Sequence, residues 1–157
     1  MAHSEIGSEP AKWDPRTRET ADHSLPYMLA VALTDGCIGP ASFEPQRYLD
    51  PKLRPLMNRI RVAEHADFTR RFPHELVSEI EVTTGSGQRL TGRAEFPKGH
   101  ARNPMTDADV ESKFRDLSAG VLGPAQMDAA LRALWRLEEA TRIGAVVDLF
   151  TTDCLLT

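Results

Sequence analysis

The segment RETADHSLPY, at residues 18–27, gathers side chains that can bind anions and transfer protons. His23 and Tyr27 lie four residues apart around a predicted helix start, so their side chains can share a face. The free N–H groups at a helix N-terminus favour a carboxylate, and a His and a Tyr add hydrogen-bonding groups to such a site. A helix N-cap at Ser24 with a half-buried Tyr27 explains the same residues, so both interpretations stay open here.

A second candidate is the segment GHARNPM at residues 99–105. Gly99 permits unusual backbone angles, and His100, Arg102 and Asn103 could together meet a carboxylate. The alternative is a connecting loop in which Asn103, placed before a proline, supplies turn chemistry.

Other motifs with a defined chemistry are missing from the sequence. No two of the five histidines stand at HxxxH or HxH spacing, so we expect no metal site. No GxSxG nucleophile motif or phosphate-binding glycine loop occurs, and the GSG at 85–87 fits a hairpin turn better. The two cysteines, Cys37 and Cys154, match neither a disulfide framework nor a zinc motif, and we expect reduced, buried thiols.

The length, charge and apolar content of the chain indicate which classes of protein it can belong to. A chain of 157 residues can form one domain with a hydrophobic core. Its formal charge of −4 and pI of about 5.7 do not indicate a positively charged surface that binds nucleic acid. The basic stretches at 52–61 and 70–71 should be solvated. No apolar run approaches the ~20 residues of a membrane span, and no secretory signal begins the sequence. We therefore expect a cytoplasmic protein that binds neither nucleic acid nor membrane.

The elements that must position the candidate residues follow from the apolar pattern. Ser24 and Gly36 are plausible ends of a helix whose apolar residues recur at helical spacing. Residues 36–58 hold many prolines and glycines and predict loops with short helical turns. Alternation predicts a strand at 60–62 and a β-hairpin from 76–82 to 89–96, which makes a small antiparallel sheet of about three strands.

Three apolar helices are predicted after the hairpin. Thr106 and Asp109 resemble a capping box at the start of the first, Pro124 opens the second, and residues 143–150 form the last. The fold class is α+β: a small antiparallel sheet with flanking helices, followed by C-terminal helices at 106–157. These helices carry more apolar surface than so small a sheet can cover, so we expect them to dock on something else.

Three blocks carry a resemblance to a known family: TRETADHSLPYMLAVALTDG at 17–36, SFEPQRYLDPKL at 42–53 and PKGHARNPMTDADVESKF at 97–114. In this order they resemble the MmgE/PrpD family, which includes 2-methylcitrate dehydratase, cis-aconitate decarboxylase and iminodisuccinate epimerase. The resemblance implies a partial α+β lid domain at 1–105 joined to a separate all-helical domain, on which the C-terminal helices at 106–157 pack. It also implies acid–base chemistry on small di- and tricarboxylates, without metal or other cofactor.

The resemblance assigns roles residue by residue. Tyr27 matches the family's active-site tyrosine in the HSxxY segment and is the expected catalytic residue; His23, Ser24 and Arg18 are expected to bind substrate. The resemblance also implies that the family's principal His and Lys belong to the helical domain and to the segment just before this chain begins, so we do not expect them in this sequence. We therefore expect a hetero-oligomer with a helical-domain subunit that carries them, or else a cleaved or partial chain.

The expected function is that of a C-terminal subunit or fragment of a 2-methylcitrate dehydratase-like hydro-lyase, which supplies the lid side of the active site. A decarboxylase or epimerase of the same family is the alternative within enzymes. The alternative from another class is a non-catalytic binding module that retains only the lid.

Overall fold

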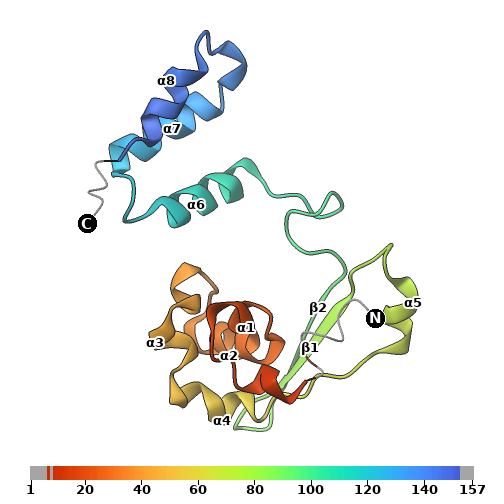
Figure 1. Ribbon diagram of the computed structural model, residues 1–157. Helices are drawn as coiled ribbons and strands as arrows, with labels where there is room; N and C mark the ends of the chain where they lie inside the picture. Colours follow the sequence, from red (N-terminus) through yellow and green to blue (C-terminus); the bar gives the residue numbers. More distant parts are fainter. Residues whose placement is uncertain (1–6, 8, 153–157) are drawn as a thin grey trace. The chain divides into compact units, whose positions relative to one another are not determined.

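The computed structural model describes residue 7 and residues 9–152 (Figure 1). Contacts along the chain divide it into two compact units, Met1–Phe96 and Pro97–Thr157. The described elements are helices and one two-stranded antiparallel sheet, so the predicted α+β class is confirmed. The predicted division into a lid domain at 1–105 and docking helices at 106–157 involves contact with a separate partner domain. This division therefore stays a prediction.

The first unit is built around helix α2, Leu25–Asp35, which contacts α1 and α4. Both predicted ends of α2 are confirmed: Ser24 Oγ accepts a hydrogen bond from the Tyr27 backbone N–H at 3.1 Å, and Gly36 adopts a φ of 76°. A left-handed C-cap of this kind favours glycine. The other helical elements of the unit are short: η1 (Pro10–Trp13), α1 (Arg18–Asp22), η2 (Pro40–Phe43), α3 (Pro45–Tyr48), η3 (Pro51–Leu53), α4 (Arg54–Met57) and α5 (Ala66–Arg71).

One hydrophobic cluster holds these short helices together. Tyr27 is fully buried at its centre, with the inward side chains of α2, α3 and α4 around it. Helices of four to six residues are unstable alone, so their order in this unit comes from tertiary packing. The buried members of the cluster are Ala21, Tyr27, Ala30, Val31, Tyr48, Leu53, Met57 and Ile60.

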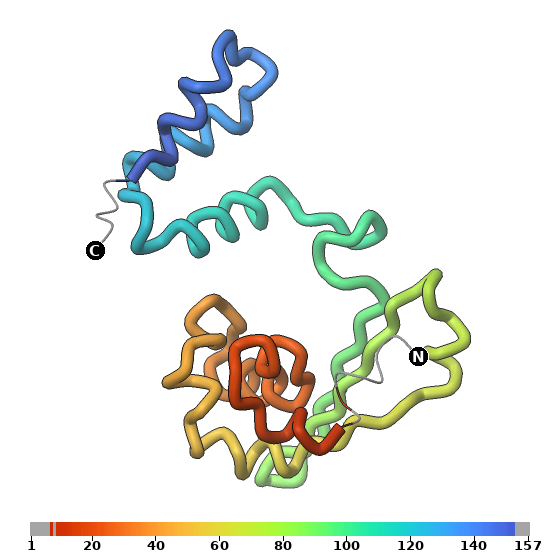
Figure 2. Tube along the Cα trace, viewed as in Figure 1, coloured from red at the N-terminus to blue at the C-terminus, as the bar shows by residue number. Residues whose placement is uncertain are grey.

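The hairpin is confirmed as strands β1, Ser78–Thr83, and β2, Arg89–Ala94. They pair antiparallel with Val82 opposite Leu90, and the two strands run side by side in the Cα trace of Figure 2. The third strand expected at 60–62 is wrong, because the described chain has no strand there. Ile60 instead buries its side chain in the core, and its carbonyl oxygen accepts a hydrogen bond from Trp13 Nε1 at 3.3 Å. A four-residue alternation is too short to distinguish a strand from a turn that buries one residue.

The second unit contains the three predicted helices. The Thr106 side chain accepts from the Asp109 backbone N–H at 3.2 Å, and the Asp109 carboxylate accepts from the Thr106 N–H at 2.7 Å, which confirms the capping box. Phe114 and Phe150 meet edge-on at 6.4 Å between ring centres. The elements are α6 (Asp107–Ser118), α7 (Pro124–Leu134), η4 (Leu137–Glu139), α8 (Ile143–Val147) and η5 (Asp148–Phe150).

Much of the apolar surface of this second unit is uncovered, as the sequence predicts. Its buried residues are few, and large apolar side chains on every helix are exposed. None of the helices in the described part of the chain is long and apolar enough to cross a bilayer. The exposed apolar residues are Val110, Leu117, Val121, Leu134, Trp135, Leu137, Ile143, Val147 and Phe150.

Candidate functional site

The four predicted site residues lie along two consecutive helices of the first unit: Arg18 begins α1, while His23, Ser24 and Tyr27 lie at or just after the break between α1 and α2. Helix α1 begins after the N-cap Thr17, whose side chain accepts from the Thr20 backbone N–H, and it ends at Asp22, with His23 as its C-cap. Helix α2 begins at Leu25, after its own N-cap Ser24. The break between the helices therefore falls within the HSxxY segment.

Ser24 is fully buried and makes two hydrogen bonds with its hydroxyl. The hydroxyl oxygen accepts from the Tyr27 backbone N–H, and the hydroxyl donates to the carbonyl oxygen of Lys12 in η1. Ser24 thus caps α2 and also fixes the preceding segment against it. These two bonds make Ser24 a positioning residue within the described unit.

Tyr27 points into the core, and its hydroxyl donates to the carbonyl oxygen of Ser42 in η2. Its ring lies tilted against Phe43, with 6.5 Å between ring centres. Burial raises the pKa of the Tyr27 phenol above its usual 10.0, and the nearby charge of Arg47 opposes that rise. The phenol therefore stays protonated at neutral pH and acts as a hydrogen-bond donor.

His23 has the opposite environment, since 68% of its side chain is exposed. Its Nδ1 lies 3.0 Å from the Glu19 carbonyl oxygen and makes a short contact with the Asp22 carboxylate. The hydrogen bond to Asp22, followed by the one to Glu19, raises the pKa of the His23 imidazole above its usual 6.5. Lys12 opposes the rise through its positive charge.

The structure brings only part of the predicted site together. Ser24 and Tyr27 are joined by a hydrogen bond, whereas His23 faces solvent and Tyr27 faces the core. Arg18 is exposed on the first turn of α1 and makes no ion pair within residues 9–152. The shared face predicted from the four-residue spacing does not form, because the helix break at Ser24 separates His23 from α2.

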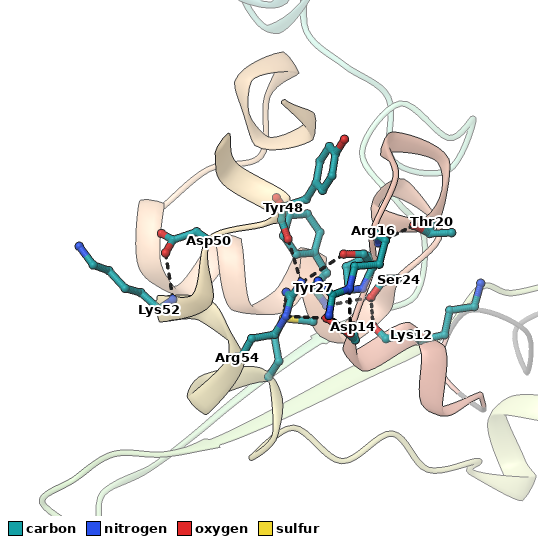
Figure 3. A network of polar contacts seen from close by, with 12 residues as sticks. Lys12, Asp14, Arg16, Thr20, Ser24, Tyr27, Tyr48, Asp50, Lys52 and Arg54 are labelled. Atoms are coloured by element: carbon teal, nitrogen blue, oxygen red, sulfur yellow. Dashed lines mark hydrogen bonds and ion pairs between the residues drawn. The ribbon is translucent and has the colours of Figure 1, made fainter. Parts of the chain in front are cut away.

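Sequence reasoning missed a polar network beside this segment, shown in Figure 3. Arg54 Nε donates to Asp14 Oδ1 at 3.0 Å, and its Nη2 donates to the carbonyl oxygens of Pro15 and Tyr48 at 3.1 and 3.0 Å. Arg16 donates to the other carboxylate oxygen of Asp14, at 2.9 Å from Nε. The bonds from Arg54 to Asp14 and to Pro15 join residues about forty positions apart, so no local sequence pattern predicts them.

Two expectations about surface residues need correction, the first of them only in part. Lys52, Arg59, Arg61 and Arg70 are exposed, as expected for solvated basic stretches, whereas only 21% of the Arg54 side chain and 27% of the Arg71 side chain are exposed. Cys37 is exposed rather than buried, because it follows the helix end at Gly36; Cys154 lies outside the described residues. Among the residues that are described, no three His, Cys, Asp or Glu side chains gather as a metal site would require.

The second candidate segment folds as a closed turn. The Gly99 N–H donates to the Asn103 carbonyl at 2.8 Å with Gly99 at a φ of 95°, and the Arg102 N–H donates to His100 Nδ1 at 3.1 Å. These bonds support the connecting-loop interpretation, because Nδ1 of His100 accepts a hydrogen bond from the backbone of the turn.

Comparison with known proteins identifies the family. The family model for the MmgE/PrpD C-terminal domain matches residues 1–137. The chain belongs to the MmgE/PrpD family. The matched region contains all four predicted site residues and the capping box of α6, while α8 lies beyond it.

Curated relatives from this family carry two enzyme names. Cis-aconitate decarboxylase from Mus musculus is 28% identical over 80% of this chain, and that from Homo sapiens is 29% identical over 80%. 2-Methylcitrate dehydratase from Cupriavidus necator is 30% identical over 71% of this chain. The chain spans about a quarter of the length of these relatives, with 25%, 26% and 24% of each covered.

Proposed function

We propose that this chain supplies the lid side of the active site of an MmgE/PrpD hydro-lyase that acts on small di- and tricarboxylates. The observation that carries the proposal is the family match over residues 1–137. It is supported by the name 2-methylcitrate dehydratase, which the Cupriavidus necator relative bears. The reaction would be a 2-methylcitrate dehydratase-like elimination of water.

Substrate carboxylates would meet the exposed side chains of α1. Arg18 offers a carboxylate its guanidinium, which makes no ion pair in the described chain, and His23 offers its outer ring nitrogen to the hydroxyl of the substrate. A guanidinium binds a carboxylate through two parallel hydrogen bonds, which fixes its orientation. Ser24 would act beneath them by holding the helix break in place.

Tyr27 is proposed as the catalytic residue of this segment on the strength of the HSxxY match. In the described unit its hydroxyl is enclosed and bonded to Ser42, so contact with substrate requires the η2 turn to move. The Tyr27→Phe variant tests this role in the assembled enzyme. Turnover within about twofold of wild type would end the assignment, because loss of one hydrogen bond typically costs ~1–3 kcal/mol.

The partner would be a helical-domain subunit that carries the family's catalytic His and Lys. The uncovered apolar side chains of the second unit support docking of this kind. An open hollow of about 720 Å³ lies among α6, α7 and α8, where Trp135 and Leu149 lie beside charged side chains such as Arg132. Purification of the chain from its source, followed by native mass measurement, would show whether such a subunit accompanies it.

Decarboxylation is the second candidate, and the cis-aconitate decarboxylase relatives that cover 80% of the chain favour it. One assay separates the two reactions. The native complex is given 2-methylcitrate and cis-aconitate in turn, and water elimination is followed by the ultraviolet absorbance of the new double bond, decarboxylation by released CO2. Activity on neither substrate, with ligand binding retained, would favour a non-catalytic binding module.

A further inference from the structure

The contacts of the His23 ring determine which of its nitrogens can exchange a proton. Both neighbours of Nδ1, the Asp22 carboxylate and the Glu19 carbonyl oxygen, are hydrogen-bond acceptors. Nδ1 must therefore carry a hydrogen in the neutral ring as well as in the charged ring. Nε2 is then the atom that gains and loses the proton.

The surroundings leave Nε2 open to a ligand. The His23 side chain is 68% exposed, and Nε2 makes no hydrogen bond within the described residues. The charged groups that act on the ring are Asp22 on the same helix and Lys12 from η1, and the hydrogen bonds to Asp22 and Glu19 favour the imidazolium. An oriented imidazolium with a free N–H is the arrangement that a general acid needs.

We propose that His23 is a general acid of the reaction, acting through Nε2, and that Asp22 is its positioning residue. This role rests on the proposed function. As the C–O bond of the substrate breaks, the Nε2–H proton passes to the departing hydroxyl and water leaves. The electron pair of the neighbouring C–H bond forms the double bond, and that proton goes to a basic side chain of the helical subunit.

The tautomer of His23 is tested without any activity measurement. Long-range nitrogen–proton NMR spectra of the histidine-labelled chain, in its purified complex, report which ring nitrogen carries hydrogen. We expect the Nδ1–H form in the neutral ring and a pKa that falls in the Asp22→Asn variant. Asp116→Asn, an exposed change on α6, is the matched control and should leave the pKa unaltered. A neutral His23 that is mainly Nε2–H would overturn the proposal.

Kinetics test the chemical role. In an active complex, His23→Gln should lower kcat by about 100-fold or more with KM changed by less than about threefold, since general acids typically contribute 10²–10⁴-fold. Asp22→Asn should move the basic limb of the pH–rate profile to lower pH, because the acid then loses its proton earlier. The exposed His74→Gln is the control and should leave both parameters unchanged.

The outcomes distinguish the two proposals. A complex that turns over substrate normally with His23→Gln would overturn the role of His23 and leave the proposed function standing. A wild-type complex that turns over neither substrate would end the proposed function, and the role of His23 with it, whatever the tautomer.

Discussion

The hydroxyl of Tyr27 donates a hydrogen bond to the backbone carbonyl oxygen of Ser42, and this bond ties helix α2 to the η2 turn. The Tyr27 side chain is fully buried, so removal of the hydroxyl takes away the donor of a buried carbonyl. The bond holds the η2 turn against α2, and this turn encloses the Tyr27 hydroxyl. Its effect on stability and any effect on catalysis can be measured separately.

Removal of this hydroxyl should destabilise the fold. We expect Tyr27→Phe to lower the free energy of unfolding by about 1–3 kcal/mol, because the Ser42 carbonyl is left buried without a partner. Urea unfolding measures the loss. Tyr48→Phe is the matched control: Tyr48 is also buried, but its hydroxyl makes no hydrogen bond in the described chain, and the change should stay below ~0.5 kcal/mol. Equal losses in the two variants would contradict the argument.

The two arginines that contact Asp14 should differ in their contribution to stability. The Arg54 side chain is 21% exposed and also donates to two backbone carbonyls, whereas the Arg16 side chain is 72% exposed and, among the described residues, bonds only to Asp14. We expect Arg54→Met to cost about 1.5–3 kcal/mol, since bonds from a charged donor to buried carbonyls are lost. Arg16→Met should cost less than ~1 kcal/mol, as exposed ion pairs do. Chemical denaturation of the two variants checks the difference, and a reversed order would contradict it.

Sequence patterns predict those features of the fold that depend on neighbouring residues. The ends of α2, the hairpin and the capping box of α6 all follow from caps and turns within a few positions, and all are confirmed. The Arg54–Asp14 contact depends on tertiary packing, so no local pattern contains it. The candidate site shows the same division: the spacing of His23 and Tyr27 suggests one face, but the cap at Ser24 breaks the helix between them.

Asp109 should make the start of α6 sensitive to acid. Hydrogen bonds from Lys98 and then Thr106 hold the pKa of this carboxyl well below its usual 3.8. A carboxyl with a depressed folded pKa contributes stability above its unfolded pKa, and that contribution is lost as the pH falls through the folded value. An NMR titration of the chain should place the Asp109 midpoint well below the usual 3.8 of an aspartate. Lys98→Met should raise the Asp109 midpoint, and an unchanged midpoint would contradict the assigned cause.

Helix α8 offers the sharpest test of docking by the second unit. Ile143 and Val147 lie four residues apart on one face of this helix and are 65% and 60% exposed. If this face binds a helical subunit, the double variant I143K/V147K should weaken the complex strongly, because two charges would lose water on binding. Thr141→Lys, an exposed change just before α8, is the control and should leave the complex intact. The native mass of each variant gives the result.

In the absence of a partner, the wild-type chain should self-associate through the same face, and the double variant should not. A wild-type chain that melts cooperatively as a monodisperse monomer would show that the apolar face needs no cover.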